Sequence, residues 1–232
     1  MQQPVRLNGV STYGSASSLL ATHKVLRNTY MLLSATLLVS ALMAGLSIAV
    51  GAPRGVGLVT SLAAMALIWF ALPRTANSEK GLYVVFGITA LLGFGLGPMI
   101  SHYLKLPNGG QLVMTALGGT ALIFGGLSAY VLTTKKDFSF MGGFLMTGVM
   151  VLFFASLALV GASFFGLNVS MAFIAMSAVS MLLFSGLILF DTSRIIHGGE
   201  TNYIMATIAL YLDILNIFTS LLHLLGFASN DD

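Results

Sequence analysis

The sequence predicts an all-α integral membrane protein with seven transmembrane helices in one domain. Of its 232 residues, 57% are hydrophobic and only 7% are charged, and the mean hydropathy is +0.96. Charged residues make up about 25% of a soluble domain, so this composition excludes a soluble fold. Apolar runs of about 18 residues or more recur along the chain, and each can cross a hydrocarbon core of roughly 30 Å as a helix.

Seven apolar segments separated by turn-forming and polar residues define the expected spans. The breaks contain residues such as Gly51, Pro53, Pro107 and Gly166, which favour turns over continued helix. Residues 1–28 are polar and rich in Gly and Ser, without the apolar region of a signal peptide. We therefore expect a flexible cytoplasmic N-terminal tail, 1–28, and a seven-helix transmembrane domain, 29–232. The predicted spans are 30–50, 55–72, 82–100, 112–132, 140–160, 169–190 and 203–227.

The distribution of basic residues predicts the orientation in the membrane. Lys and Arg accumulate in cytoplasmic loops, and a cytoplasmic N-terminus places eight of the ten on that side. Only Arg54 and Lys105 then lie outside. With an odd number of spans, the C-terminus lies in the periplasm of a bacterium, so the predicted location is the bacterial inner membrane.

Composition and motif spacing disfavour several classes of function. A net charge of +3 is too sparse for a nucleic-acid binder, and the lack of cysteine excludes disulfides, thiolate metal sites and cysteine nucleophiles. No P-loop is present, no Gly-x-Gly-Asp segment surrounds Asp213, and the last span has no lysine for a retinal Schiff base. The histidines have no metal-ligand spacing. We therefore expect no enzymatic activity and no tightly bound cofactor.

Glycine clusters indicate where helices approach closely. Gly93 and Gly97 have GxxxG spacing in the third span, just before Pro98, and the fourth span contains four glycines. Small residues at such spacing let membrane helices pack backbone to backbone. A packing role is therefore favoured over a substrate site, although Pro98 could also break its helix. The fourth-span glycines are Gly118, Gly119, Gly125 and Gly126.

Asp213 is the strongest candidate for a functional residue. It lies ten residues into the last span, about 15 Å along a helix and near the membrane midplane. A carboxylate at that depth is costly unless paired, hydrated or protonated, and is functional by default. Asn216, Ser220 and His223 share its helical face. This polar stripe is expected to face the bundle interior, where Asn216 and Ser220 could equally be structural hydrogen-bonding residues.

Asp191, near the end of the sixth span, allows two interpretations. It could be a solvated carboxylate at a helix end, paired with Arg194 at i+3. Alternatively, the sixth helix continues to about Ile196 and brings Asp191 within reach of Asp213, which requires a bend or a shifted helix. If the two carboxylates meet in a poorly solvated site, they cannot both ionise easily, and the pair would sense pH.

Four stretches of the chain resemble the Bax inhibitor-1 family, which is also called the transmembrane BAX inhibitor motif family. They are residues 93–98 (GFGLGP), 129–140 (AYVLTTKKDFSF), 187–191 (LILFD) and 211–216 (YLDILN). Residues 22–30, 117–121 and 197–204 are more specifically similar to the bacterial branch whose members modulate FtsH, a membrane-anchored, ATP-dependent protease.

The resemblance implies a seven-helix bundle with the last helix central. It also implies roles for particular residues, because Asp191 and Asp213 match the aspartate pair that calcium-leak members of the family use as a pH-sensitive gate. In those proteins an arginine of the second span pairs with the first aspartate in the closed pore. Arg74 is the candidate here, although Pro73-Arg74 departs from the family's basic run.

Two functions therefore remain open at the level of sequence. The resemblance favours an interaction protein that binds and modulates the FtsH complex through its helices, with the N-terminal tail as a handle for the protease. The alternative is a pH-gated calcium or cation leak in which Asp191 and Asp213 form a transient calcium or proton site, since Ca²⁺ prefers oxygen ligands. Arg74, Asn216 and Ser220 would then gate or line the pore. The expected partners are the lipid bilayer, FtsH, and calcium or protons, but not nucleic acid.

Overall fold

The computed structural model describes residues 11–229, with side chains from residue 21 onward. Within that range, seven helical segments are long and apolar enough to cross a membrane, which confirms the predicted fold class. Short turns join them. The helices are α1 (Ser11–Ala49), α2 (Val56–Ala66) continued by a π-helix (Leu67–Ala71) and α3 (Leu72–Thr75), α4 (Lys80–Leu104), α5 (Gly109–Thr134), a 3₁₀ turn (Ser139–Met141) leading into α6 (Gly142–Phe164), α7 (Ser170–Ile196) and α8 (Tyr203–Ala228).

All seven predicted spans correspond to observed helices, and the main differences are at the ends. The largest is at the N-terminus, where α1 begins at Ser11, so residues 11–28 of the predicted tail are helical. This stretch contains no proline and only Gly14 as a helix-weakening residue, so nothing in it ends the helix. Residues 1–10 of the predicted tail lie outside the described range. α7 runs to Ile196, as the second interpretation of Asp191 required.

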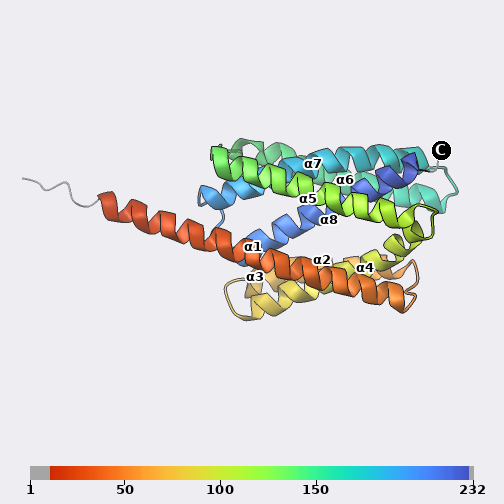
Figure 1. Ribbon diagram of the computed structural model, residues 1–232, viewed down its shortest axis with the longest axis horizontal. Helices are drawn as coiled ribbons and strands as arrows, with labels where there is room; N and C mark the ends of the chain where they lie inside the picture. The colour runs from red at the N-terminus through yellow and green to blue at the C-terminus, as the bar shows by residue number, and fades with distance from the viewer. Residues whose placement is uncertain (1–10, 230–232) are drawn as a thin grey trace, which may run out of the picture.

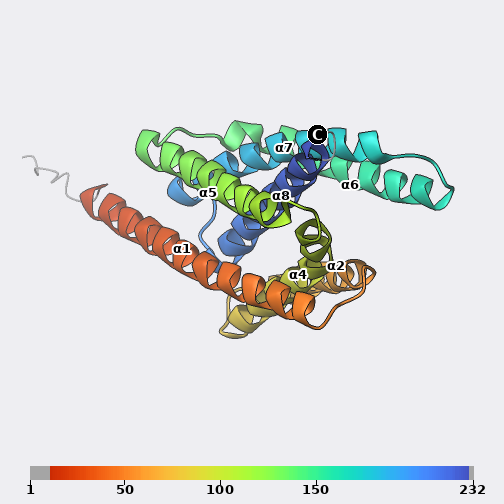
Figure 2. The same cartoon turned by 45° about the vertical axis from the view of Figure 1, so that its right-hand side comes forward.

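Two groups of helices lie on opposite sides of α8. α1, α2 and α4 pack together in one group and α5, α6 and α7 in the other, while α8 crosses obliquely between them (Figures 1 and 2). The first turns of α1 project beyond the rest of the bundle in both views. Because α8 contacts members of both groups, it connects the two halves of the molecule.

The central position of α8 is also visible in its burial. Half of its most apolar stretch is buried, against 33% for α1, the next most buried span. Three of the four apolar clusters in the described residues include α8 side chains, among them Ile208, Leu210 and Leu222. Polar contacts also hold α8 in place: the Ser40 hydroxyl of α1 bonds the Tyr211 hydroxyl at 2.7 Å. The last helix is therefore central, as predicted.

The glycines of the third span pack as predicted, whereas most of those in the fourth do not. A Cβ at Gly93 or Gly97 of α4 would collide with α1 at Ser40 or Ser47, so their lack of a side chain permits close packing. α4 continues through Pro98 to Leu104, so Pro98 does not end the helix. In α5, a Cβ at Gly118, Gly125 or Gly126 would meet no described atom within 4 Å. These three glycines face open space, so the packing explanation is wrong for them.

Candidate functional site

The two aspartates meet between α7 and α8. Their carboxyl groups are within hydrogen-bonding reach of each other, and the residues are 9% exposed at Asp191 and 3% at Asp213. α7 and α8 pack against each other, and α8 crosses the bundle obliquely (Figure 2). Asp213 Oδ2 is buried without a hydrogen-bond donor in the described residues. A single proton shared between the carboxyls would satisfy both groups.

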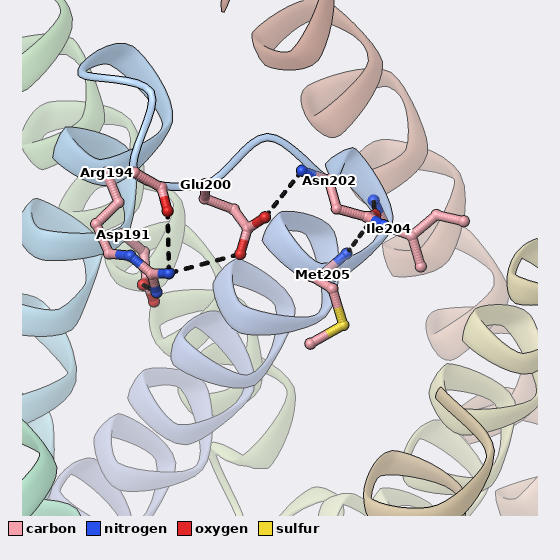
Figure 3. Close-up of polar contacts among 7 residues, drawn as sticks. Asp191, Arg194, Glu200, Asn202, Ile204 and Met205 are labelled. Carbon is pink, nitrogen blue, oxygen red and sulfur yellow. Dashed lines mark hydrogen bonds and ion pairs between the residues drawn. The ribbon is translucent and has the colours of Figure 1, made fainter. Parts of the chain in front are cut away.

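Arg194 is the cation that lies beside Asp191. Its guanidinium lies 3.8 Å from Asp191 Oδ1 and 3.6 Å from Glu200 Oε2, and it also donates to the Gly199 carbonyl at 3.4 Å (Figure 3). It stacks on the Phe190 ring at 5.5 Å from the centroid. One arginine thus links the end of α7 to the turn before α8, and compensates the negative charge of two carboxylates.

The turn between α7 and α8 extends this network to a third segment. The Asn202 backbone donates to Glu200 Oε1 at 2.8 Å, and the Asn202 side chain accepts from the backbone N–H groups of Ile204 and Met205 (Figure 3). Asn202 therefore caps α8 at its N-terminus. Its side-chain amide also donates to the Ala76 carbonyl at 2.9 Å, which ties the cap to the α3–α4 turn.

The loop between α5 and α6 joins the same face of the molecule. The Phe138 backbone donates to the Ser193 hydroxyl at 2.9 Å, and His197 contacts the Lys135 carbonyl at 3.2 Å through Nε2. In this loop, hydrogen bonds from the Ser139 side chain and backbone hold the pKa of the Asp137 carboxyl below its usual value. The α7–α8 turn and the α5–α6 loop thus both contact the end of α7, and Asn202 joins the α3–α4 turn to the start of α8.

Arg74 does not take the position that the resemblance implied. It lies exposed in α3 and donates to the Phe70 carbonyl of its own helical turn at 2.6 Å. The cation beside Asp191 is Arg194, at the i+3 spacing noted in the sequence. A π-helical turn precedes Pro73, which has no N–H to donate to the preceding turn. The gating role of Arg74 stays a prediction without a contact to support it here.

Asn216 and Ser220 lie in the half of α8 that follows Asp213 and line a separate cavity. This cavity has a volume of about 300 Å³ and lies between α6, α7 and α8, with His223 also in its wall. Asp213 does not line it. The four polar residues of the predicted stripe are therefore divided between two environments: Asp213 lies against Asp191, and the other three line the cavity.

The donor set around the aspartates does not fit a resident calcium ion. Ca²⁺ takes six to eight oxygen ligands, whereas the described residues contain no cluster of three or more acidic, histidine or cysteine side chains that could hold a metal. The Thr192 hydroxyl is buried beside Asp191 in the sequence and without a partner, but one hydroxyl does not complete the shell. The transient calcium or proton site at Asp191 and Asp213 stays a prediction.

Sequence reasoning missed Glu200, Asn202 and Ser193 as parts of this site. Asn202 had a recognisable signal, because it stands immediately before the last apolar span, where helix caps occur. Glu200 and Ser193 had none, since their partners are brought together only by the fold.

Comparisons with known proteins place the chain in a family. The family model described as "Inhibitor of apoptosis-promoting Bax1" matches residues 22–230. A Vibrio cholerae protein named "Uncharacterized membrane protein" is 51% identical over 92% of this chain and 93% of its own length. The Escherichia coli K12 protein named "Modulator of FtsH protease YccA" is 49% identical over 96% of this chain and 98% of its own. A second E. coli relative, also 49% identical, is named "Inner membrane protein YccA".

Proposed function

Since the chain belongs to the Bax inhibitor-1 family, we propose that this multi-pass inner-membrane protein binds and modulates the FtsH protease complex. The observation that carries the proposal is the 49% identity to the E. coli modulator of FtsH protease, which extends over nearly the full length of both chains. The proposed role is non-enzymatic and requires no tightly bound cofactor. Orientation with a cytoplasmic N-terminus remains part of the proposal.

Two regions of the molecule could contact FtsH: the N-terminal part of α1 and the outward-facing sides of the helices. The first turns of α1 project beyond the bundle, where a membrane-anchored partner can reach them (Figure 1). Large apolar side chains are exposed on the π-helical turn that follows α2, at Trp69 and Phe70, and on α6, at Phe144 and Phe154. Such faces contact lipid or the transmembrane helices of a partner.

The direct test is copurification of FtsH with the tagged full-length chain from membranes solubilised in mild detergent. Variants lacking residues 1–10 or 1–20 are compared with it at equal expression. FtsH recovered with the full chain and reduced by the longer deletion supports α1 as a contact. Unchanged recovery with both deletions assigns the contact to the membrane-embedded helices. Failure of the full chain to recover FtsH overturns the proposal.

A second candidate function is a pH-gated cation conduit, which is compatible with FtsH binding. The observation that favours it is the contact between two carboxyl groups inside a membrane bundle, because such groups are costly there and mark ion or proton pathways. In this proposal, protonation of the pair and the guanidinium of Arg194 hold the pathway closed. Deprotonation then separates the carboxylates by like-charge repulsion.

Cation flux into liposomes carrying the purified protein tests this candidate. We expect calcium entry at about pH 8 and little at about pH 6, with the pH dependence lost in Asp213→Asn and Asp191→Asn. Thr120→Ala, in a neighbouring cavity, is the control and should behave as the parent chain. Flux no higher than that of empty liposomes at either pH removes the conduit candidate and leaves FtsH modulation in place.

A further inference from the structure

The cavity between α6, α7 and α8 differs from a second, larger cavity in the residues that form its wall. Seven of its twelve lining side chains carry a hydroxyl, amide or imidazole group. These seven are Ser156, Ser177, Ser180, Asn216, Thr219, Ser220 and His223. A second cavity of about 540 Å³, between α1, α4, α5 and α8, has only two such residues, Ser40 and Thr120, among sixteen.

The hydroxyls of the two cavities also differ in how they are satisfied. In the larger cavity Ser40 bonds the Tyr211 hydroxyl and Thr120 bonds the Ala116 carbonyl, each at 2.7 Å. In the smaller one Ser156, Ser177 and Thr219 donate to carbonyls of their own helices, whereas Ser180 and Ser220 form no side-chain hydrogen bond with any described residue. Neither of these two is among the described hydroxyls that are enclosed without a partner, so both are open to the cavity. A hydroxyl that faces apolar surroundings without a partner costs free energy, so the two favour a hydrogen-bonding occupant.

The position of the cavity gives that occupant a way in. Ser177 lies seven residues after the start of α7, about 10 Å along the helix, and His223 lies five residues before the end of α8, about 8 Å. Both ends belong to the membrane face that carries the α6–α7 loop. Ser177 and His223 are hydrogen-bonded to each other at 3.3 Å. The cavity thus extends from near this face to Asn216, one helical turn before Asp213.

We propose that this cavity is a water-filled vestibule, open to the face of the α6–α7 loop and ending at Asn216. Its volume accommodates several water molecules, and the two unpartnered hydroxyls provide the polar contacts that a membrane-buried water needs. A lipid acyl chain is disfavoured as the occupant, because it would leave Ser180 and Ser220 without hydrogen bonds. The vestibule brings solvent within one turn of Asp213 and depends neither on FtsH binding nor on conduction.

The absence of cysteine from the chain makes the test direct. Single variants Ser220→Cys and Ser180→Cys are reconstituted in liposomes and treated with a charged, membrane-impermeant methanethiosulfonate, which reacts with a hydrated thiolate. Thr120→Cys is the matched control, since Thr120, like Ser220, is 4% exposed and lines the apolar cavity. Leu167→Cys, in the exposed α6–α7 loop, marks full reactivity and the accessible face.

We expect Ser220→Cys and Ser180→Cys to react at least about tenfold faster than Thr120→Cys, and only from the face at which Leu167→Cys reacts. Labelling after denaturation in detergent confirms that each thiol is present. Reaction of both variants no faster than that of Thr120→Cys, with Leu167→Cys fully labelled, overturns the proposal and indicates a dry or lipid-filled cavity. Reaction only from the opposite face also overturns it.

Discussion

The two ends of α8 handle polar groups in opposite ways. At the N-terminal end, Asn202, Glu200 and Arg194 join the α7–α8 turn to the end of α7 and to the α3–α4 turn through ion pairs and hydrogen bonds. Beyond Asp213, His223 bonds Ser177 across the wall of a cavity, and Ser220 faces the same cavity without a side-chain partner among the described residues. One end of the helix is fastened by protein groups, and the other has polar groups that solvent can satisfy.

This difference follows from the cost of burying each kind of group. An ionised carboxylate at membrane depth requires a compensating charge or a proton, and here Asp213 lies against Asp191, which has Arg194 beside it. A neutral hydroxyl requires only one hydrogen bond, which water provides. We therefore expect single substitutions in the charged site to lower the free energy of unfolding strongly, and substitutions in the cavity wall to lower it little.

The largest expected effect is that of Asn202→Ala. The substitution removes the α8 cap and the hydrogen bonds to Ala76 and Asn77, and we expect it to lower the free energy of unfolding by about 2 kcal/mol. Ser229→Ala is the control at the opposite end of α8, where the exposed contact with Asn108 should matter by less than about 1 kcal/mol. Unfolding of both variants in micelles measures the difference. Equal losses would show that the two ends are not fastened differently.

Arg194→Gln is expected to have the next largest effect. It removes the cation shared by Asp191 and Glu200 and should destabilise the fold by about 1–2 kcal/mol, since the guanidinium is partly exposed. Adding Asp191→Asn should restore part of this loss, because the uncompensated charge disappears. A double-mutant cycle gives the coupling energy. Strictly additive effects would mean that Arg194 does not compensate the Asp191 carboxylate.

A pair of serine substitutions sharpens the contrast between satisfied and solvent-facing hydroxyls. Ser40→Ala breaks the hydrogen bond with the buried Tyr211 hydroxyl and should cost about 1 kcal/mol. Ser220→Ala removes no hydrogen bond within the protein and should change stability by less than about 0.5 kcal/mol. The same unfolding measurement serves both. A larger loss for Ser220→Ala than for Ser40→Ala would contradict the assignment of Ser220 to a solvent-filled wall.

The smallest effect is expected at Asp137 and depends on pH. Hydrogen bonds from Ser139 lower the pKa of this carboxyl in the folded protein, so its stabilising contribution is present above the ordinary value of 3.8 and is lost as pH falls through the lower folded value. The melting temperature of the parent chain should therefore fall more steeply below about pH 4 than that of Asp137→Asn. If the melting temperatures of the two proteins fall in parallel with pH, the Asp137 carboxylate makes no such contribution to stability.

Much of the fold could be predicted from the sequence, because hydropathy determines which segments cross a membrane. All seven spans and the burial of Asp213 were predicted in this way. The family resemblance implied the central position of the last helix, and the structure confirmed it. The helical start of α1 was missed, since a polar segment can continue a helix beyond the bilayer without any apolar signal.

The site was predictable only in part. The aspartate pair was anticipated, but whether the two carboxyls meet depends on how α7 and α8 pack, which no sequence pattern encodes. The cation beside Asp191 is Arg194, which the i+3 spacing had offered as one of two interpretations, and the role of Arg74, which is exposed, stays a prediction. The division of the α8 polar stripe between a charged site and a cavity could not be predicted either, because helical spacing gives the face and not the neighbours.

The measurement that tests the proposed function most directly is the rate at which purified FtsH degrades a membrane protein substrate in liposomes. FtsH is reconstituted alone, with this chain, or with an unrelated seven-helix protein at the same ratio. We expect the rate per FtsH to change with this chain, to saturate as the ratio rises, and to stay constant with the unrelated protein. An unchanged rate at every ratio, with both proteins in the same bilayer, would contradict the proposal that the chain modulates the protease.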